Sequence, residues 1–256
     1  MDTKKPSVWL SCKMVGHSVI VVTSLWLRML VGRANAKTMD EHLVWFWKGL
    51  LRISRTRVCV KRLGHFPANK TYVYMSNHLS HMDIPVIFAT VQGHLRMVMK
   101  RELERLPLFG SILLRLGFVS VDRQNPTQGF KQLQQAQKRM LEGASIWIAP
   151  EGSRSRTGQL GRLRRGGFHL AIQLGVPIVP IWIDGTQRVL PPGGRAVRCE
   201  QTVTTYVGDP ITTQGLQLNR EGIADLMQRF QTCLMQLKKQ NNTSSKGFYE
   251  QQPSTK

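Results

Sequence analysis

Acidic residues are scarce in this 256-residue chain: 15 aspartates and glutamates stand against 36 lysines and arginines, which gives a formal net charge of +21 at pH 7. A charge of this size points to an anionic partner. The chain contains no recognisable nucleic-acid-binding module, and its aromatic residues do not alternate with the basic ones as a base-stacking surface requires. We therefore expect no nucleic acid as a partner and favour an anionic membrane surface.

Cysteine is also sparse, and the four cysteines lie far apart in the sequence, at positions 12, 59, 199 and 233. They form neither a Cys-x-x-Cys pair nor a close set, so they offer no thiolate metal site. Separated cysteines of this kind predict reduced thiols in a reducing compartment rather than a disulfide framework.

A long uninterrupted apolar run is missing as well. The N-terminal segment Val8–Val31 is apolar, but Lys13, His17 and Arg28 interrupt it, and its longest clean run, Ser18–Leu27, has ten residues. A membrane-spanning helix needs about 20 apolar residues. No convincing signal-peptide cleavage site follows the segment.

A second apolar stretch, His42–Ile53, follows the first after a polar link. Four of the six tryptophans fall within the first 47 residues, namely Trp9, Trp26, Trp45 and Trp47. Tryptophan beside lysine and arginine is typical of the boundary between lipid headgroups and acyl chains. We expect two helices that lie in the membrane interface or dip into one leaflet, with a single tilted transmembrane helix over residues 8–31 as the alternative.

From residue 57 onward, short apolar runs alternate with longer segments of helical periodicity. Strands are predicted at 57–63, 71–75, 96–99, 117–121, 145–149, 178–183 and 202–207. Helices are predicted at 82–90, 110–116, 128–141, 166–174 and 220–239. This alternation indicates an α/β fold with a largely parallel sheet flanked by helices. We expect membrane-associated helices over residues 1–56, the α/β domain over 57–240 and a disordered polar tail over 241–256.

The most informative stretch is Asn77-His-Leu-Ser-His-Met-Asp83, which follows a predicted strand. On an ideal helix, five steps would leave the side chains of His78 and Asp83 roughly 140° apart. We therefore expect His78 at the turn between strand and helix and Asp83 in the first helical turns, so that the turn brings them together. A histidine bonded to an aspartate is a general base, because the carboxylate fixes one tautomer and stabilises the imidazolium. A helix-capping turn with a surface histidine is the alternative.

A second cluster, Pro150-Glu-Gly-Ser-Arg-Ser-Arg156, follows the predicted strand at 145–149. Glycine lets a backbone turn approach an anion closely, and arginine binds phosphate oxygens through two N–H groups. The cluster therefore predicts an anion-binding turn, with an ordinary surface turn as the alternative.

Together with further blocks, the two clusters resemble the motifs of the 1-acylglycerol-3-phosphate acyltransferase family. The four motif-like blocks, in order, are Asn77–Asp83, Gly117–Arg123, Pro150–Ser155 and Val176–Ile183. Two other family-like stretches are Lys100–Leu103 with Pro107 and Gly110, and Gly166–Ala171. The resemblance covers about residues 58–210. Ala149 and Ser153 stand where Phe and Thr are commoner, and both keep the chemistry of the turn.

The resemblance implies transfer of an acyl group from acyl-CoA or acyl-carrier protein to the 2-hydroxyl of 1-acylglycerol-3-phosphate, which gives phosphatidic acid. His78 and Asp83 are the implied catalytic residues: His78 takes the hydroxyl proton and Asp83 orients His78. A thioester is already activated, so neither an enzyme nucleophile nor a cofactor is expected. Ser80 is therefore assigned to capping the helix that carries Asp83.

Substrate binding falls to the basic and turn residues of the other motifs. Arg123 and Arg154 are expected to hold the acceptor phosphate, with Lys100 as a third cation. Glu151, Gly152 and Ser153 are assigned to positioning the acceptor. Because acceptor and product are lipids, we expect a membrane-associated enzyme whose active site faces the cytoplasmic side.

Three other functions are weighed against this one. The first is an acyltransferase that acts on a different lysolipid. The second is a basic membrane-binding protein without catalysis. The third is a metal-dependent hydrolase whose ligands include His78-x-x-His81-x-Asp83. A metal site needs three or more ligands. The other histidines considered, at 65, 94 and 169, show no ligand spacing, so no metal is assigned.

Overall fold

The computed structural model describes residues 5–32, 36–67, 70–91, 93–122 and 126–249. Its centre is a sheet of strands in the order β1-β7-β6-β2-β5-β3-β4. Neighbouring strands run parallel except β6 and β7, which are antiparallel. The strands are β1 (Arg57–Arg62), β2 (Val73–Ser76), β3 (Leu95–Lys100), β4 (Val119–Val121), β5 (Ser145–Ile148), β6 (Ile178–Asp184) and β7 (Thr202–Val207). The predicted α/β fold is confirmed, and each predicted strand overlaps an observed one.

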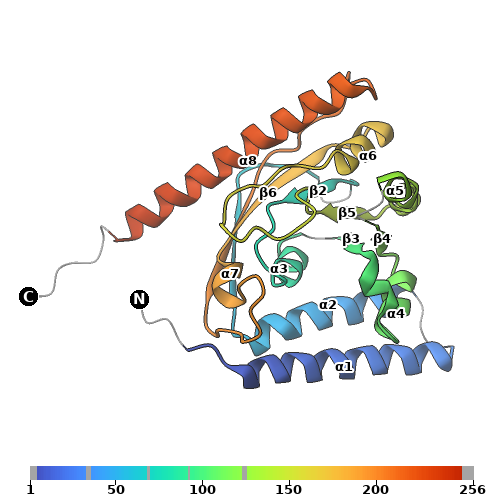
Figure 1. Ribbon diagram of the computed structural model, residues 1–256, viewed down its shortest axis with the longest axis vertical. Coiled ribbons are helices and arrows are strands. Elements are labelled where there is room, and N and C mark those ends of the chain that lie inside the picture. Colours follow the sequence, from blue (N-terminus) through green and yellow to red (C-terminus); the bar gives the residue numbers. More distant parts are fainter. Residues whose placement is uncertain (1–4, 33–35, 68–69, 92, 123–125, 250–256) are drawn as a thin grey trace, which may run out of the picture.

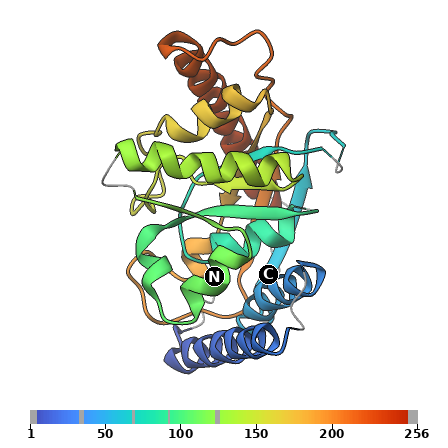
Figure 2. The same ribbon diagram turned by 90° about the vertical axis from the view of Figure 1, so that its right-hand side faces the viewer.

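Helices cover both faces of the sheet, as a parallel sheet requires (Figures 1 and 2). One apolar cluster lies on the side of α1 (Val8–Leu30), α2 (Ala36–Ile53), α3 (Asp83–Thr90) and α4 (Phe109–Arg115). A second lies on the side of α5 (Pro126–Leu141), α6 (Gly166–Leu174) and α8 (Arg220–Tyr249). Two short elements, the 3₁₀ helix η1 (Arg101–Arg105) and α7 (Thr186–Val189), were not predicted, because so few residues carry too little periodicity.

Strand β2 lies in the middle of the sheet, and all four of its residues are buried. It pairs in parallel with both β5 and β6. The carboxyl ends of these three strands therefore lie at one edge of the sheet, where ligands bind in open α/β folds. The predicted motifs at 77–83 and 150–156 leave the sheet at this edge, from β2 and β5.

Helix α2 buries one face against the α/β core. The ring of Trp47 stacks on Phe88 of α3 with 5.3 Å between the ring centroids, and Trp47 is 7% exposed. Trp47, which the sequence groups with the tryptophans typical of a headgroup boundary, is therefore part of the core. Trp9 and Trp45, in contrast, are 64% and 48% exposed.

Helix α1 packs on α2 and contacts α4, but most of its surface is uncovered. Val21 and Leu25 are its buried residues. Its large apolar side chains that are more than half exposed are Val8, Trp9, Val15, Val19, Ile20, Leu27 and Leu30. By length and composition, α1 is the helix of the described chain that is able to cross a membrane.

The last helix is longer than the sequence pattern predicts. Its predicted end at Lys239 is wrong, because α8 continues to Tyr249. The predicted disordered tail is therefore helical over 241–249, while 250–256 lie outside the described residues. Buried apolar residues anchor the helix on α6 and the sheet, at Leu226, Phe230, Leu234 and Leu237. Once a helix is nucleated on such a face, it propagates through polar residues that carry no apolar signal.

Candidate active site

His78 lies just beyond the end of β2, and Asp83 is the first residue of α3. The turn between them brings the side chains together as predicted, with His78 Nδ1 2.6 Å from Asp83 Oδ2. The Asp83 side chain is fully buried, whereas 13% of the His78 side chain is exposed. A carboxylate only accepts hydrogen bonds, so Nδ1 carries the proton and donates it. In the neutral imidazole this leaves Nε2 as the nitrogen that can accept a proton.

Three further donors hold the Asp83 carboxylate. The backbone N–H groups of Leu79 and Ser80 donate to Oδ2 at 2.7 and 3.0 Å. The hydroxyl of Thr186, the first residue of α7, donates to Oδ1. Thr186 is fully buried. Sequence reasoning missed it, because it lies 103 residues from Asp83 and no local pattern marks it.

Two polar side chains fasten the catalytic turn to β6 and the loop after it. The Asn77 amide donates to the Ile183 carbonyl at 2.8 Å and accepts the Ile183 N–H at 2.7 Å, so it continues the pairing of β2 with β6. The Ser80 hydroxyl donates to the Leu190 carbonyl at 2.6 Å and accepts the Met82 N–H at 3.0 Å. Met82 is the N-cap of α3 and has no side-chain cap. The predicted capping role of Ser80 is therefore wrong: its hydroxyl instead ties the turn to Leu190.

Glu151 braces the same turn from the side of β5. One carboxylate oxygen accepts the His78 N–H at 2.9 Å and the other accepts the Gly161 N–H at 2.8 Å. Burial raises the pKa of Glu151, although both N–H donors favour its ionised form. The Ser155 N–H donates to the His78 carbonyl at 2.7 Å. Both oxygens of Glu151 thus bind backbone, and its contact with an acceptor stays a prediction.

Aromatic and basic groups surround the His78 ring. Trp147 meets it edge to face, with 6.1 Å between centroids, and is itself held by a 3.0 Å bond to the Ser76 hydroxyl. His81 lies at the exposed rim, where partial burial lowers its pKa and the Arg154 guanidinium lowers it further. Arg154 therefore lies on the His81 side of the turn.

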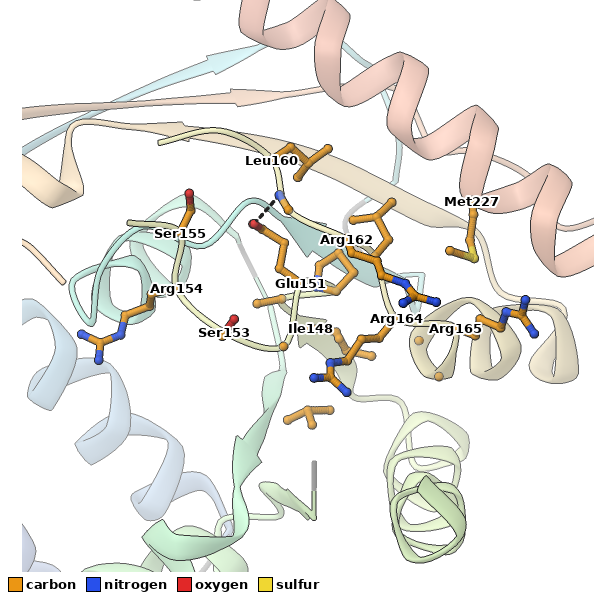
Figure 3. Close-up of a pocket in the computed structure, with 18 of the residues that line it drawn as sticks. Ile148, Glu151, Ser153, Arg154, Ser155, Leu160, Arg162, Arg164, Arg165 and Met227 are labelled. Carbon is orange, nitrogen blue, oxygen red and sulfur yellow. Dashed lines mark hydrogen bonds between the residues drawn. The ribbon is translucent and has the colours of Figure 1, made fainter. Parts of the chain in front are cut away.

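A cavity of about 1260 Å³ opens beside the turn at 150–155 (Figure 3). Ser153 and Arg154 line it together with three arginines of the following loop, Arg162, Arg164 and Arg165. Val98, Val121, Ile148, Leu163 and Met227 supply apolar lining. The cavity adjoins the His78 turn through Glu151, which lines the cavity and accepts the His78 N–H.

Two other predicted binding residues stand apart from this cavity. Lys100, at the end of β3, forms an exposed ion pair with Glu102 at 2.8 Å and is not among the lining residues. Arg123 lies outside the described residues. Gly152 has a φ of +73°, and a Cβ there would lie 2.6 Å from Arg164 Nε, so an arginine side chain approaches the turn closely. The role of Gly152 in positioning the acceptor stays a prediction. In the described part of the chain, no group of three or more His, Cys, Asp or Glu is positioned to hold a metal ion.

The acyltransferase family model matches residues 57–184, half of the chain. The chain belongs to the acyltransferase family. This acyltransferase is 27% identical over 208 residues to a chloroplastic 1-acyl-sn-glycerol-3-phosphate acyltransferase of Brassica napus, with 78% of the chain and 59% of that protein covered. It is 29% identical over 195 residues to 1-acyl-sn-glycerol-3-phosphate acyltransferase alpha of Ovis aries, with 75% of the chain and 66% of that protein covered. The acyltransferase thus spans roughly three fifths to two thirds of the length of these relatives.

A solved structure shares the fold of this acyltransferase. It is the 1-acyl-sn-glycerophosphate (LPA) acyltransferase PlsC of Thermotoga maritima, with a TM-score of 0.73 and 20% sequence identity. The match covers 92% of this chain and 96% of that one. The likeness therefore extends over nearly the whole chain and establishes the fold.

Proposed function

We propose that this acyltransferase moves an acyl group from an acyl thioester to the 2-hydroxyl of 1-acylglycerol-3-phosphate and so forms phosphatidic acid. The observation that carries the proposal is the His78–Asp83 pair, in which a buried carboxylate holds a partly exposed imidazole at 2.6 Å. The acceptor is inferred from the relatives named for this reaction and from Arg154, which lines the cavity beside the pair.

The chemistry requires one base and an activated donor. The acceptor hydroxyl oxygen attacks the thioester carbonyl carbon while its proton passes to Nε2 of His78. Asp83 stabilises the resulting imidazolium. When the tetrahedral intermediate collapses, the carbon–sulfur bond breaks and the imidazolium returns the proton to the leaving thiolate. The products are an ester and a free thiol, and acyl-CoA or acyl-carrier protein serves as co-substrate.

The acceptor phosphate is assigned to Arg154. It lines the cavity, lies near enough to His81 to lower that pKa, and forms no ion pair with a carboxylate within the described ranges. Arg123 is retained from the sequence as a second phosphate ligand. Lys100 would first have to leave Glu102, which costs less than about 1 kcal/mol for an exposed pair. Gly152 and Ser153 would present the backbone of the turn to the acceptor.

We further propose that the enzyme works at the cytoplasmic face of an anionic membrane. The exposed apolar side of α1 supplies a lipid-facing surface. The ring of Trp9 lies 3.5 Å from Lys13 Nζ, a pairing suited to the headgroup boundary. The net charge of +21 supplies attraction to anionic lipids.

Replacement of the base tests the mechanism. His78→Ala should lower turnover roughly 10²–10⁴-fold, the usual worth of a general base, and leave the fold intact. Asp83→Asn should also be severe, because the favoured tautomer is lost. Initial rates with labelled acyl-CoA give the result, and circular dichroism checks the fold. A folded His78→Ala protein with near-wild-type turnover would refute the mechanism.

The same assay with a panel of acceptors tests the substrate. Lysophosphatidic acid should be acylated with the highest kcat/KM among lysophospholipids of equal chain length. A higher kcat/KM for lysophosphatidylcholine or lysophosphatidylethanolamine would reassign the enzyme to that lysolipid.

A further inference from the structure

A second group of cations lines the cavity away from Arg154. Arg162, Arg164 and Arg165 belong to the loop between β5 and α6, and their side chains are exposed. None of the three forms an ion pair with a carboxylate in the part of the chain that the structure describes. Three unpaired guanidinium groups on one cavity wall repel one another, so the wall favours an anionic ligand.

Backbone contacts fix this loop to the catalytic turn. The Arg164 N–H donates to the Pro150 carbonyl at 2.8 Å, and the Gly161 N–H donates to Glu151 at 2.8 Å. The Arg164 side chain lies against Gly152, where no Cβ stands in its way. The loop that carries the arginines is therefore linked to the His78 turn through Glu151, which accepts a backbone hydrogen bond from each.

The arginines point in different directions around the cavity, and Arg164 lies between the others, against Gly152. Figure 3 shows Arg154 pointing toward α3 and the N-terminal helices, while Arg162 and Arg165 extend toward α6. The lowered pKa of His81 places Arg154 on the α3 side. Met227 of α8 lines the cavity near the other group. A lipid acceptor would approach from the N-terminal helices, so the second group is left for the other substrate.

The size and lining of the cavity define the chemistry of that substrate. A volume of about 1260 Å³ exceeds that of typical small-molecule sites, which hold about 300–1,000 Å³. The ligand must be long, carry several negative charges at one end and be less polar along its length, to match Ile148 and Leu163. Coenzyme A has this form, with three phosphates on its nucleotide and a neutral arm that ends in the thioester. An acyl-carrier protein would bring the same arm with a single phosphodiester, so three arginines lining one cavity match the three phosphates of coenzyme A better.

We propose that Arg162, Arg164 and Arg165 bind the nucleotide phosphates of an acyl-CoA, and that the cavity is the donor site of this enzyme. The proposal rests on the proposed acyl transfer. It makes coenzyme A, rather than an acyl-carrier protein, the carrier that the chain recognises.

Steady-state kinetics with both substrates varied test the assignment. Arg162→Gln and Arg164→Gln should each raise the KM for a long-chain acyl-CoA roughly ten-fold or more, as loss of a charge-assisted hydrogen bond does. The KM for lysophosphatidic acid should change less than about two-fold. Arg220→Gln is the matched control, because this exposed arginine begins α8 and does not line the cavity. Arg154→Gln should show the reverse pattern, with the acceptor KM raised.

A donor that lacks the 3′-phosphate gives a more specific test. The same acyl chain on 3′-dephospho-CoA should be a poorer donor for the wild type, and an arginine variant that has lost its contact with the 3′-phosphate should no longer distinguish the two donors. A rise of the acceptor KM alone in Arg162→Gln and Arg164→Gln would overturn the proposal. So would unchanged KM values for both substrates, or a defect seen with acyl-carrier protein only.

Direct binding separates this inference from the proposed reaction. Equilibrium dialysis with labelled free CoA should show binding to the wild type and at least ten-fold weaker binding to the double variant Arg162→Gln/Arg164→Gln. That result would support the site even if lysophosphatidic acid were not the acceptor. Equal binding of CoA to the wild type and the double variant would overturn it whatever the activity.

Discussion

At the scale of single residues, Thr186 positions the catalytic carboxylate. Thr186→Val keeps the shape of the side chain but leaves Asp83 Oδ1 without its hydroxyl donor in a fully buried site. An unsatisfied buried acceptor costs about 1–3 kcal/mol, so kcat should fall roughly 5- to 150-fold with both KM values little changed.

The conservative variant Thr186→Ser separates positioning from packing. It restores the donor and loses one methyl group, so it should recover most of the activity. If Thr186→Ser is as slow as Thr186→Val, or if Thr186→Val keeps the wild-type kcat, the hydroxyl does not position Asp83. Thermal unfolding of both variants controls for loss of stability.

Whether a residue of the site was predictable depends on how local its contacts are. His78 and Asp83 belong to one turn, so a seven-residue pattern contains the whole interaction. Thr186 lies on an unpredicted four-residue helix, and its partner lies 103 residues away. The bracing role of Glu151 depends on its two backbone partners, His78 and Gly161, and on the register of β2 beside β5. The sequence predicts the motif but not this register.

At the scale of elements, the outward face of α1 is predicted to bind lipid. Ile20 is 64% exposed, and full burial of such a side chain is worth about 1.5–3 kcal/mol. Ile20→Ser should therefore weaken partition into vesicles roughly ten-fold while stability in solution changes little. Leu141→Ser is the matched control, because Leu141 is 75% exposed on α5, across the sheet from α1. Equal vesicle binding by Ile20→Ser and wild type would contradict a lipid-facing α1.

The elements also show where sequence patterns suffice. Central strands such as β2, β5 and β6 are buried over their whole length, or nearly so, and read as short apolar runs. Helix α2 is different. Trp45 and Trp47 lie in similar sequence surroundings, yet Trp47 is buried and Trp45 is exposed. The burial of Trp47 follows from α3 packing on α2, a contact that the local sequence does not encode. Point substitutions on α1 are therefore a cleaner test than deletion of residues 1–53, which would also remove core residues.

At the scale of the whole molecule, charge and the apolar face of α1 should act together on a membrane. The net charge of +21 draws the protein to anionic vesicles, and 0.5 M salt reduces the screening length to a few ångströms. Raising salt should therefore weaken cosedimentation with anionic vesicles but not abolish it, since apolar contact is not screened. Complete release at high salt would show that charge alone holds the protein there.

The long-range ties of the catalytic turn have a consequence for the order in which the enzyme folds. Four hydrogen bonds of the turn join residues that are far apart in the sequence. The separations are 73 residues for His78 and Glu151, 103 for Asp83 and Thr186, 106 for Asn77 and Ile183, and 110 for Ser80 and Leu190. Contacts so distant along the chain form late and slow folding. During synthesis the base emerges from the ribosome long before the groups that hold it. A nascent chain that stops short of Leu190 thus carries an incompletely braced histidine and should be catalytically silent, so that acyl transfer begins only after residue 190 has been made.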